Sequence, residues 1–453
     1  MFNMASARLY ALKISLYCRN AIHAMPKRFL HNLLSIGFLT SSSIILAGSF
    51  VVNVLNYVFT LLISRLLGVE AFGEVTALFS LLLVVSVPAA ALTMLMTRQT
   101  AAFSWQGTGA LEDMFRVLQR HVLVASLVFW LAFLGATPLL SRFLHIPYLP
   151  LFIFSVLIPV TLASALQTGA LQGLQEFFML AKQSVLGTLI KLVVSLLLVY
   201  AGFSVVGVMV GLVLAQCAAW GYGYLATKQF LGMPHSESRA APFTFRLSSF
   251  SPILTTTLLL VLLSNVDVLM AKHFLPADVA GQYAALSTLG KILIYGVGAF
   301  ITVLLPMVSA AHAREQTESM STSMGGGVKI LAMSLSIISA ASIFLFLVFT
   351  FYATFVVTVL FGTRYAAIAP FLPQFSIAMA CISLATAFIN YFVAVENTSF
   401  IYFLLVGIAS EVALVLWYHS SLGAMTLCLV ASSMFLLLMM MVNFLLSRRQ
   451  LPV

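Results

Sequence analysis

Long apolar stretches separated by short polar segments run through the whole sequence. Twelve of these stretches have about the 20 residues that a helix needs to cross a bilayer. They cover residues 36–64, 73–97, 122–140, 151–172, 183–202, 205–226, 250–270, 283–309, 328–350, 366–393, 400–418 and 424–446. Strict alternation of apolar and polar residues is missing from them, which argues against the strands of a membrane β-barrel. The pattern predicts an all-α polytopic membrane protein with about 12 transmembrane helices.

The polar segments divide the chain into two halves of six predicted helices each. We expect a basic cytoplasmic tail at 1–35, an N-terminal six-helix bundle at 36–226, a cytoplasmic linker at 227–249, a C-terminal six-helix bundle at 250–446 and a cytoplasmic tail at 447–453. The predicted outer loops are short, which excludes a large external catalytic domain, so we do not expect an enzyme. The inner segment 103–121 mixes apolar and charged residues in the pattern of an amphipathic helix on the membrane surface.

An internal repeat supports the division into halves. The segment 67–78 (LGVEAFGEVTAL) resembles 275–286 (LPADVAGQYAAL) at an offset of 208, with four of twelve positions identical. Gly73 corresponds to Gly281, and both copies follow the first helix of a half. Chance recurrence of such a loop is the alternative. A true duplication predicts two bundles related by a pseudo-two-fold axis along the membrane normal, as in transporters with parallel repeats.

Composition and charge agree with a membrane protein. Only 8% of residues are Asp, Glu, Lys or Arg, against about 25% in soluble domains, which excludes a soluble enzyme and a disordered regulator. With a cytoplasmic N-terminus, sixteen Lys and Arg residues fall in inner segments and four in outer loops, namely Arg65, Arg142, Lys272 and Arg364. This positive-inside bias explains the net charge of +10 without nucleic acid as a partner. It predicts a multi-pass protein of the inner (plasma) membrane with both termini cytoplasmic.

Cysteine and histidine positions predict no metal site and no cofactor. The four cysteines lack paired spacing, and the eight histidines fall in termini, loops or helix edges. Residues 1–34 are basic and contain no acid. We favour a cytoplasmic or membrane-surface tail, and an organellar targeting peptide is the alternative.

Polar residues inside the predicted spans are the first candidates for function, because lipid cannot satisfy them. One face of the first span carries Asn53, Asn56 and Tyr57 among other polar residues. Amide and phenol groups in this arrangement suit a polyhydroxylated ligand in a central cavity. The alternative is that they bond neighbouring helices, at about 0.6 kcal/mol for each bond.

Four ionisable residues lie within spans, where each charge costs about 2.5–3.5 kcal/mol on insertion scales. Lys191 and Lys291 are candidate ligands for an anionic substrate, and Asp267 and Glu411 are candidates for ion coupling. Mutual neutralisation, for instance of Lys291 by Asp267, is the alternative. Arg65 is a further candidate for the cavity, since it breaks the positive-inside pattern and a guanidinium can bind two phosphate oxygens.

Several short motifs resemble a known transporter family. They are SRLLGVEAFG at 64–73, LQGLQ at 171–175, DVLMA at 267–271, AGQY at 280–283 and LFG at 360–362 before Tyr365. Together they resemble the oligosaccharide (Wzx-type) flippases and polysaccharide export proteins of the multidrug/oligosaccharidyl-lipid/polysaccharide exporter superfamily. The resemblance extends over about 36–446, and the order and spacing of the motifs carry it.

The resemblance implies a V-shaped twelve-helix flippase that moves polyprenyl-pyrophosphate-linked oligosaccharide across the membrane by alternating access. It implies lipid-linked oligosaccharide and membrane lipid as partners, with a glycan polymerase or export proteins as possible further partners. In such proteins cavity cations meet the pyrophosphate or acidic sugars, and Arg65, Lys191 and Lys291 are the candidates here. The alternative is an ion-coupled multidrug exporter of the same superfamily, although these usually carry an acid in the first span, where Asn53 and Asn56 stand.

Overall fold

The computed structural model describes residues 27–103, 108–231, 251–296, 308, 326–395 and 397–449. Within these ranges all regular elements are helices. The N-terminal half contains α2 (Lys27–Leu67), α3 (Val69–Val85), α4 (Val87–Phe103), α5 (Thr108–Leu144), α6 (Tyr148–Ser155), α7 (Leu157–Gly173), α8 (Phe177–Leu198), η1 (Val199–Phe203) and α9 (Ser204–Leu231). The C-terminal half contains α10 (Ser251–Leu263), α11 (Val266–Phe274), α12 (Ala277–Gly290), α14 (Gly326–Phe351), α15 (Ala353–Leu360), η3 (Thr363–Phe371), α16 (Leu372–Ala394), α17 (Phe400–Trp417) and α18 (Leu422–Arg449).

The helices confirm an all-α membrane architecture. Among the described residues, eight helices are long and apolar enough to cross a membrane, and the number is ten when two bent pairs each count as one span. The bent pairs are α3 with α4, at 41°, and α10 with α11, at 46°. Every predicted span except the eighth corresponds to a described helix or bent pair. The eighth, 283–309, begins in α12, and its residues 297–307 and 309 lie outside the described ranges.

The fifth and sixth spans form a helical hairpin within a continuous apolar segment, Phe177–Phe230. The chain reverses at η1, where Gly202 has φ 92° and Ser204 has φ 45°. The positive φ at position 202 is a conformation that favours glycine. Beyond the turn, close contacts pair Leu198 with Gly207, Ser195 with Gly211 and Gln183 with Gly223. Along this series the residue numbers in α8 fall while those in α9 rise, so α8 and α9 are antiparallel.

The predicted surface helix at 103–121 is wrong. Its first residue, Phe103, ends α4, and its described part from Thr108 belongs to α5, which continues without a break into the third span. Met114, Phe115 and Leu118 are buried and pack in one cluster with side chains of α4 and α7. The apolar face that suggested a membrane surface is therefore covered by protein.

The predicted boundaries between the domains fall close to segments outside the described ranges. Helix α2 begins at Lys27, inside the stretch predicted as tail, and the residues before it lie outside the described ranges. The predicted linker 227–249 overlaps the end of α9, and its residues from 232 onward also lie outside the described ranges.

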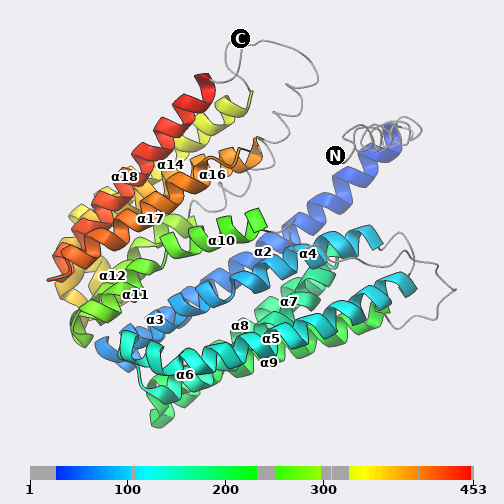
Figure 1. Cartoon of the computed structure of the whole chain (residues 1–453), viewed down its shortest axis with the longest axis horizontal. Coiled ribbons are helices and arrows are strands. Elements are labelled where there is room, and N and C mark those ends of the chain that lie inside the picture. Colours follow the sequence, from blue (N-terminus) through cyan, green and yellow to red (C-terminus); the bar gives the residue numbers. More distant parts are fainter. Residues whose placement is uncertain are drawn as a thin grey trace, which may run out of the picture.

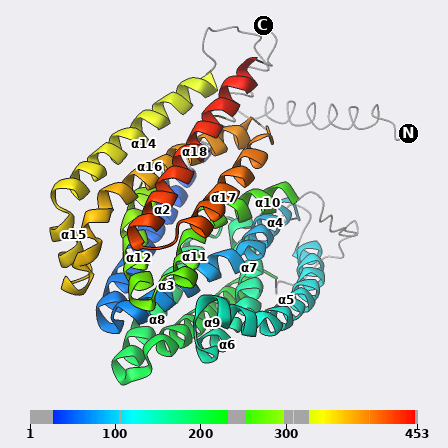
Figure 2. The same cartoon turned by 60° about the vertical axis from the view of Figure 1, so that its left-hand side comes forward.

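The helices are arranged as two bundles that form a V (Figure 1). Helices α2–α9 make one arm, and α14, α16, α17 and α18 run along the other. The arms meet where α3, α11 and α12 lie side by side, and they separate toward the end where α2 begins and α18 ends. Figure 2 shows the same divergence from another side. We call the meeting point the closed end; the predicted orientation puts it on the outer face of the membrane.

Two glycines related by the internal repeat make the central contact of the closed end. A Cβ atom on Gly73 of α3 would lie 2.9 Å from the Cα atom of Gly281 on α12. A residue that touches its own repeat partner lies on the axis that relates the two copies, as in an isologous interface. The contact thus supports the predicted pseudo-two-fold symmetry.

We expect Gly281→Ala to hold the two bundles apart at the closed end. Its Cβ atom would lie 2.0 Å from the Val69 carbonyl oxygen, whereas carbon and oxygen normally approach to about 3.3–3.6 Å. The helices must therefore move by roughly 1 Å or more. Electron paramagnetic resonance distances between spin labels at Tyr148 and Phe355, which are both exposed, should lengthen.

The matched control is Gly135→Ala on α5, where an added Cβ meets nothing within 4 Å. This variant should keep the distance distribution of the parent chain. An unchanged distribution in Gly281→Ala would contradict the assignment of the glycine pair as the contact that sets the spacing.

Candidate substrate cavity and buried charge cluster

The N-terminal bundle contains a polar pocket between α7, α8 and α9, with a volume of about 330 Å³. We call it the α7–α9 pocket. Its polar lining consists of Ser164, Thr168, Gln183, Ser184, Thr188, Lys191 and Gln216. Hydroxyl and amide groups both donate and accept hydrogen bonds, so the lining suits a ligand with many hydroxyl groups. Lys191 is the one charged residue of that lining.

Lys191 connects the pocket to the first span. Its Nζ donates a hydrogen bond to Asn56 Oδ1 on α2 and lies 4.6 Å from the centroid of the Phe59 ring. The amide oxygen and the ring face both favour a cation. No carboxylate forms an ion pair with Lys191 among the described residues, so its charge stays available to an anionic ligand.

Several buried polar atoms of α2, α7 and α8 lack a hydrogen-bond partner in the described structure. Within the described ranges these include the Tyr57 hydroxyl of α2, Gln183 Oε1 of α8 and Gln167 Oε1 of α7. An unsatisfied buried polar group costs about 1–3 kcal/mol. A bound polar molecule would supply the missing partners, and Gln183 lines the α7–α9 pocket itself.

The remaining polar residues of the first span are divided by the structure. Asn53 is exposed and has no role in the Lys191 contact. Thr60 and Ser64 donate hydrogen bonds to the carbonyl oxygens of Asn56 and Leu61, within α2. Asn56 thus contacts a lining residue of the pocket, Lys191, while Tyr57 follows it on α2 with a buried hydroxyl that has no described partner.

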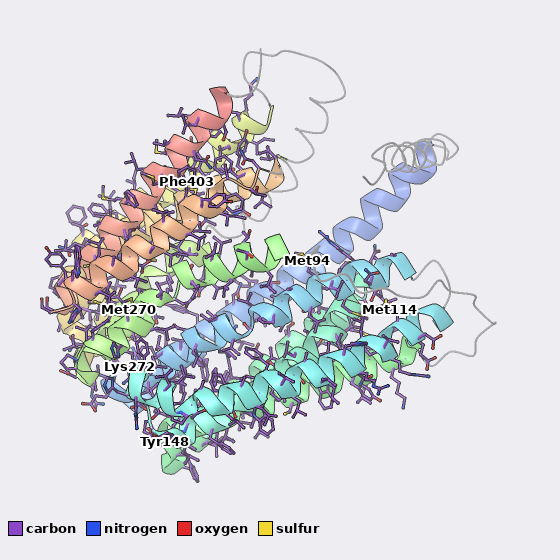
Figure 3. All side chains as sticks on the ribbon, viewed as in Figure 1. Met94, Met114, Tyr148, Met270, Lys272 and Phe403 are labelled. Atoms are coloured by element: carbon purple, nitrogen blue, oxygen red, sulfur yellow. The ribbon has the colours of Figure 1, made fainter. Side chains whose placement is uncertain are left out.

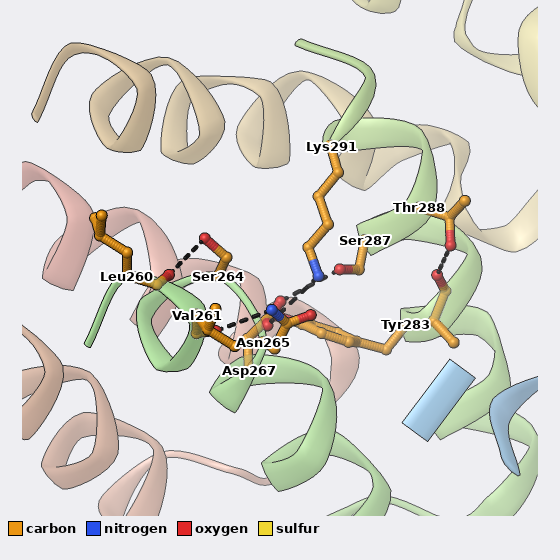
Figure 4. A network of polar contacts seen from close by, with 10 residues as sticks. Leu260, Val261, Ser264, Asn265, Asp267, Tyr283, Ser287, Thr288 and Lys291 are labelled. Carbon is orange, nitrogen blue, oxygen red and sulfur yellow. Dashed lines mark hydrogen bonds and ion pairs between the residues drawn. The ribbon is translucent and has the colours of Figure 1, made fainter. Parts of the chain in front are cut away.

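The C-terminal bundle holds a buried cluster of charges around Asp267 (Figure 4). Lys291 Nζ lies 4.0 Å from Asp267 Oδ1. The Tyr283 hydroxyl and the Ser287 hydroxyl donate to Asp267 Oδ2 at 3.2 and 3.4 Å. Asp267 lies in the first turn of α11, directly after the break between α10 and α11. At this break the side-chain amide of Asn265, which precedes α11, donates to the Val261 carbonyl oxygen at 2.9 Å.

Glu411 of α17 adds a second carboxylate to this cluster. It is 1% exposed and interacts electrostatically with Asp267 and Lys291. Asp267 Oδ1 and Glu411 Oε1 are buried atoms without a hydrogen-bond partner in the described structure. Two carboxylates face one lysine, so charge balance calls for one bound proton or cation. The sequence left two interpretations of Lys291 open: a ligand of the substrate in the cavity, or the cation that neutralises Asp267. The structure places Lys291 beside Asp267, as the second interpretation predicts.

Arg65 lies at the closed end and bonds to the other bundle. Its Nε donates to the Leu360 carbonyl oxygen at 3.1 Å, and its Nη2 donates to the Val359 carbonyl oxygen. These carbonyls belong to the last turn of α15, where a cation is favoured. The structure therefore separates Arg65 from both Lys191 and Lys291.

Two further side chains seal the closed end in the same way. The Tyr365 hydroxyl donates to the Ser64 carbonyl oxygen at 3.1 Å, and His273 Nδ1 bonds to the Phe143 carbonyl oxygen at 2.7 Å. The Phe72 ring of α3 packs edge-on against Phe361 at a centroid distance of 5.8 Å. Each of these contacts joins the two bundles.

Lys272 is a buried cation at the closed end that the sequence reading assigned to an outer loop. It lies on α11 next to α3 (Figure 3), is 4% exposed, and interacts electrostatically with Glu74 and Glu70 of α3. Lys272 could have been found by the criterion that selected Arg65, because it too is a cation on the predicted outer side and breaks the positive-inside pattern. The roles of Tyr283 and Gln183 had no comparable signal, because single polar residues are common in apolar helices.

Comparison with known families gives a match over most of the chain. The sequence model of a family described as "Polysaccharide biosynthesis protein" matches residues 38–312. No curated protein matches the sequence.

Solved membrane transporters share the fold. The chain resembles an inward-facing multidrug resistance MATE family transporter of the MOP superfamily, with a TM-score of 0.71, 12% identity and coverage of 88% of this chain and 94% of that one. It resembles the lipid II flippase MurJ in an inward closed conformation, with a TM-score of 0.61, 12% identity and coverage of 88% and 87%. An outward-facing MATE family transporter gives a TM-score of 0.58 at 14% identity, with coverage of 90% and 95%.

We expect Lys291→Met to destabilise the protein strongly and Asp267→Asn to offset much of that loss. Removing one partner of a buried pair costs about 3–5 kcal/mol, because the other charge stays buried and uncompensated. The double variant should therefore be more stable than the sum of the two single effects predicts. Thermal unfolding of the four proteins in detergent measures the cycle.

The exposed pair Arg116–Glu112, at 3.1 Å, serves as the control for this cycle. Arg116→Met should change stability by only about 0.3–0.5 kcal/mol. Additive effects of Lys291→Met and Asp267→Asn would contradict a direct interaction between the two buried charges.

Proposed function

The chain belongs to the polysaccharide biosynthesis protein family, and we propose that it is a flippase for lipid-linked glycans. Its substrate would be polyprenyl-pyrophosphate-linked oligosaccharide, moved across the inner membrane for the synthesis of a cell-surface polysaccharide. The observation that carries the proposal is the α7–α9 pocket, in which hydroxyl and amide groups surround the Lys191 ammonium. This lining combines partners for sugar hydroxyls with one cation for an acidic group.

A flippase must provide a polar site for the head group of its lipid substrate, and we propose that the α7–α9 pocket is this site. The glycan and its pyrophosphate are too polar to enter hydrocarbon, while the polyprenyl tail is stable there. We infer that the head group enters between the arms of the V from the open end and reaches Lys191, Gln183 and Thr188. The tail stays in the bilayer throughout. Such a protein needs no covalent chemistry, which agrees with a transporter rather than an enzyme.

Transport would then require the closed end to open. The bonds from Arg65, Tyr365 and His273 to carbonyl oxygens of the other bundle would break, and the open end would close. The energy for this change would come from an ion gradient. The Asp267–Glu411–Lys291 cluster is the proposed coupling site, because one bound proton or cation would balance its two carboxylates against one lysine.

We expect deletion of the gene to leave lipid-linked oligosaccharide in the inner leaflet. Polyprenyl-linked glycans extracted from such cells should accumulate and should be shielded from a probe that acts outside the membrane. Complementation with Lys191→Gln should restore export at least about ten-fold less well than the parent chain, since a hydrogen bond to a charged group contributes about 1.5–3 kcal/mol. Lys329→Gln on α14, which removes an exposed cation outside the pocket, is the matched control.

A multidrug exporter is the second candidate, favoured by the TM-score of 0.71 to the inward-facing MATE family transporter. It predicts normal glycans in the deletion strain together with raised sensitivity to cationic drugs. That result would overturn the flippase proposal. The lysine in the pocket opposes this candidate, because its ammonium group would repel a cationic drug.

We expect Asp267→Asn to uncouple transport from the ion gradient without removing the substrate site. The variant should bind lipid-linked oligosaccharide like the parent chain, because Asp267 lies in the other bundle from the α7–α9 pocket. In proteoliposomes its flipping rate should no longer respond to an imposed proton or sodium gradient. A full response would remove the cluster from the coupling mechanism.

A further inference from the structure

Helix α8 has a second hollow on its membrane-facing side, separate from the α7–α9 pocket. It is a trough of about 550 Å³, bordered by Ala47 and Gly48 of α2 and Tyr222 of α9, with α8 side chains from Phe178 to Leu189 as its floor. We call it the α8 trough. Its lining is apolar except for Lys182 and the Tyr222 hydroxyl, so its contents must be largely hydrocarbon.

Small residues make the hollow. A Cβ atom on Gly48 would lie 2.9 Å from the Ala181 Cβ, so α2 and α8 approach closely at this point. Neither residue has a side chain that could fill the space beside the contact. The trough is therefore a consequence of how the two helices cross, and it opens at the molecular surface, where Phe178, Leu186 and Leu189 are exposed.

The trough is charged at one end and apolar along the rest. Lys182 Nζ lies 4.4 Å from the centroid of the Phe178 ring, one turn closer to the start of α8, so the ammonium points toward the membrane boundary. From Lys182 the floor continues through Val185 to Leu189, a rise of about 10 Å at 1.5 Å per residue. An amphiphile with a charged head and an apolar chain has the same order of groups.

The sign of the charge selects the head group. The ion pairs of the described part of the chain are Arg116–Glu112 and Lys291–Asp267, so no described carboxylate neutralises Lys182. We propose that the α8 trough binds an anionic phospholipid of the surrounding membrane. The phosphate lies against Lys182, and one acyl chain follows the floor past Val185 and Leu189. This site is independent of the glycan site, because Lys182 and Lys191 lie on opposite faces of α8.

Lipid binding to the full-length protein tests the proposal. The purified chain in detergent micelles is titrated with phosphatidylglycerol or phosphatidylcholine, and bound lipid is counted by native mass spectrometry. The parent chain should prefer phosphatidylglycerol. Lys182→Gln should weaken its binding about five-fold, the size expected for one lysine near a lipid phosphate. Val185→Trp fills the trough without a charge change and should reduce the binding of both lipids.

Lys228→Gln is the matched control, because it removes a cation from the same hairpin at the last turn of α9, outside the trough. It should bind phosphatidylglycerol like the parent chain. Equal binding by the parent chain, Lys182→Gln and Lys228→Gln would overturn the proposal, and so would equal affinity of the parent chain for the two phospholipids. Displacement of phosphatidylglycerol by a polyprenyl phosphate at much lower concentration would assign the trough to a polyprenyl lipid instead. Unchanged thermal stability of lipid-free Val185→Trp excludes misfolding as the cause of its loss of lipid.

Discussion

The backbone contact between Gly73 and Gly281 is the constraint on which the arrangement of the two bundles depends. Because neither residue has a side chain, α3 and α12 approach more closely there than ordinary helices can. The approach brings Phe72 against Phe361 and puts Arg65 and Tyr365 within reach of carbonyl oxygens of the other bundle. With the helices joined at this end, their directions alone determine how far the arms of the V separate at the other.

The polar groups of the membrane interior are divided between the bundles. The N-terminal bundle contains hydroxyl and amide groups around one ammonium, and the C-terminal bundle contains two carboxylates with one lysine. The described contacts of each set come from its own bundle, for example Lys191 with Asn56 and Asp267 with Tyr283. A rigid rotation of one bundle against the other therefore leaves both sets intact and changes only the contacts at the closed end.

The sequence predicted the spans well, because lipid imposes an apolar length that is visible in composition. It also brought Asn56 and Lys191 forward as cavity residues, and the structure joins them by a hydrogen bond. It assigned Arg65 to an anionic ligand, whereas its partners are carbonyl oxygens of α15. Such acceptors belong to every residue and leave no mark in a sequence. The prediction of a surface helix at 103–121 was wrong for a related reason. An amphipathic helix has the same sequence pattern whether its apolar face is covered by lipid or, as here, by α4 and α7.

The side-chain hydrogen bonds described at the closed end are chemically one-sided. Their donors are the particular side chains of Arg65, Tyr365 and His273, whereas their acceptors are main-chain oxygens of Val359, Leu360, Ser64 and Phe143. Amino-acid exchange at the acceptor positions alters shape but never removes the oxygen. Substitutions are thus tolerated less well at the donor positions of these bonds than at the acceptor positions. For these hydrogen bonds, three positions bear the chemical requirement, and the segments that supply the acceptors can change in sequence as long as the backbone keeps its path.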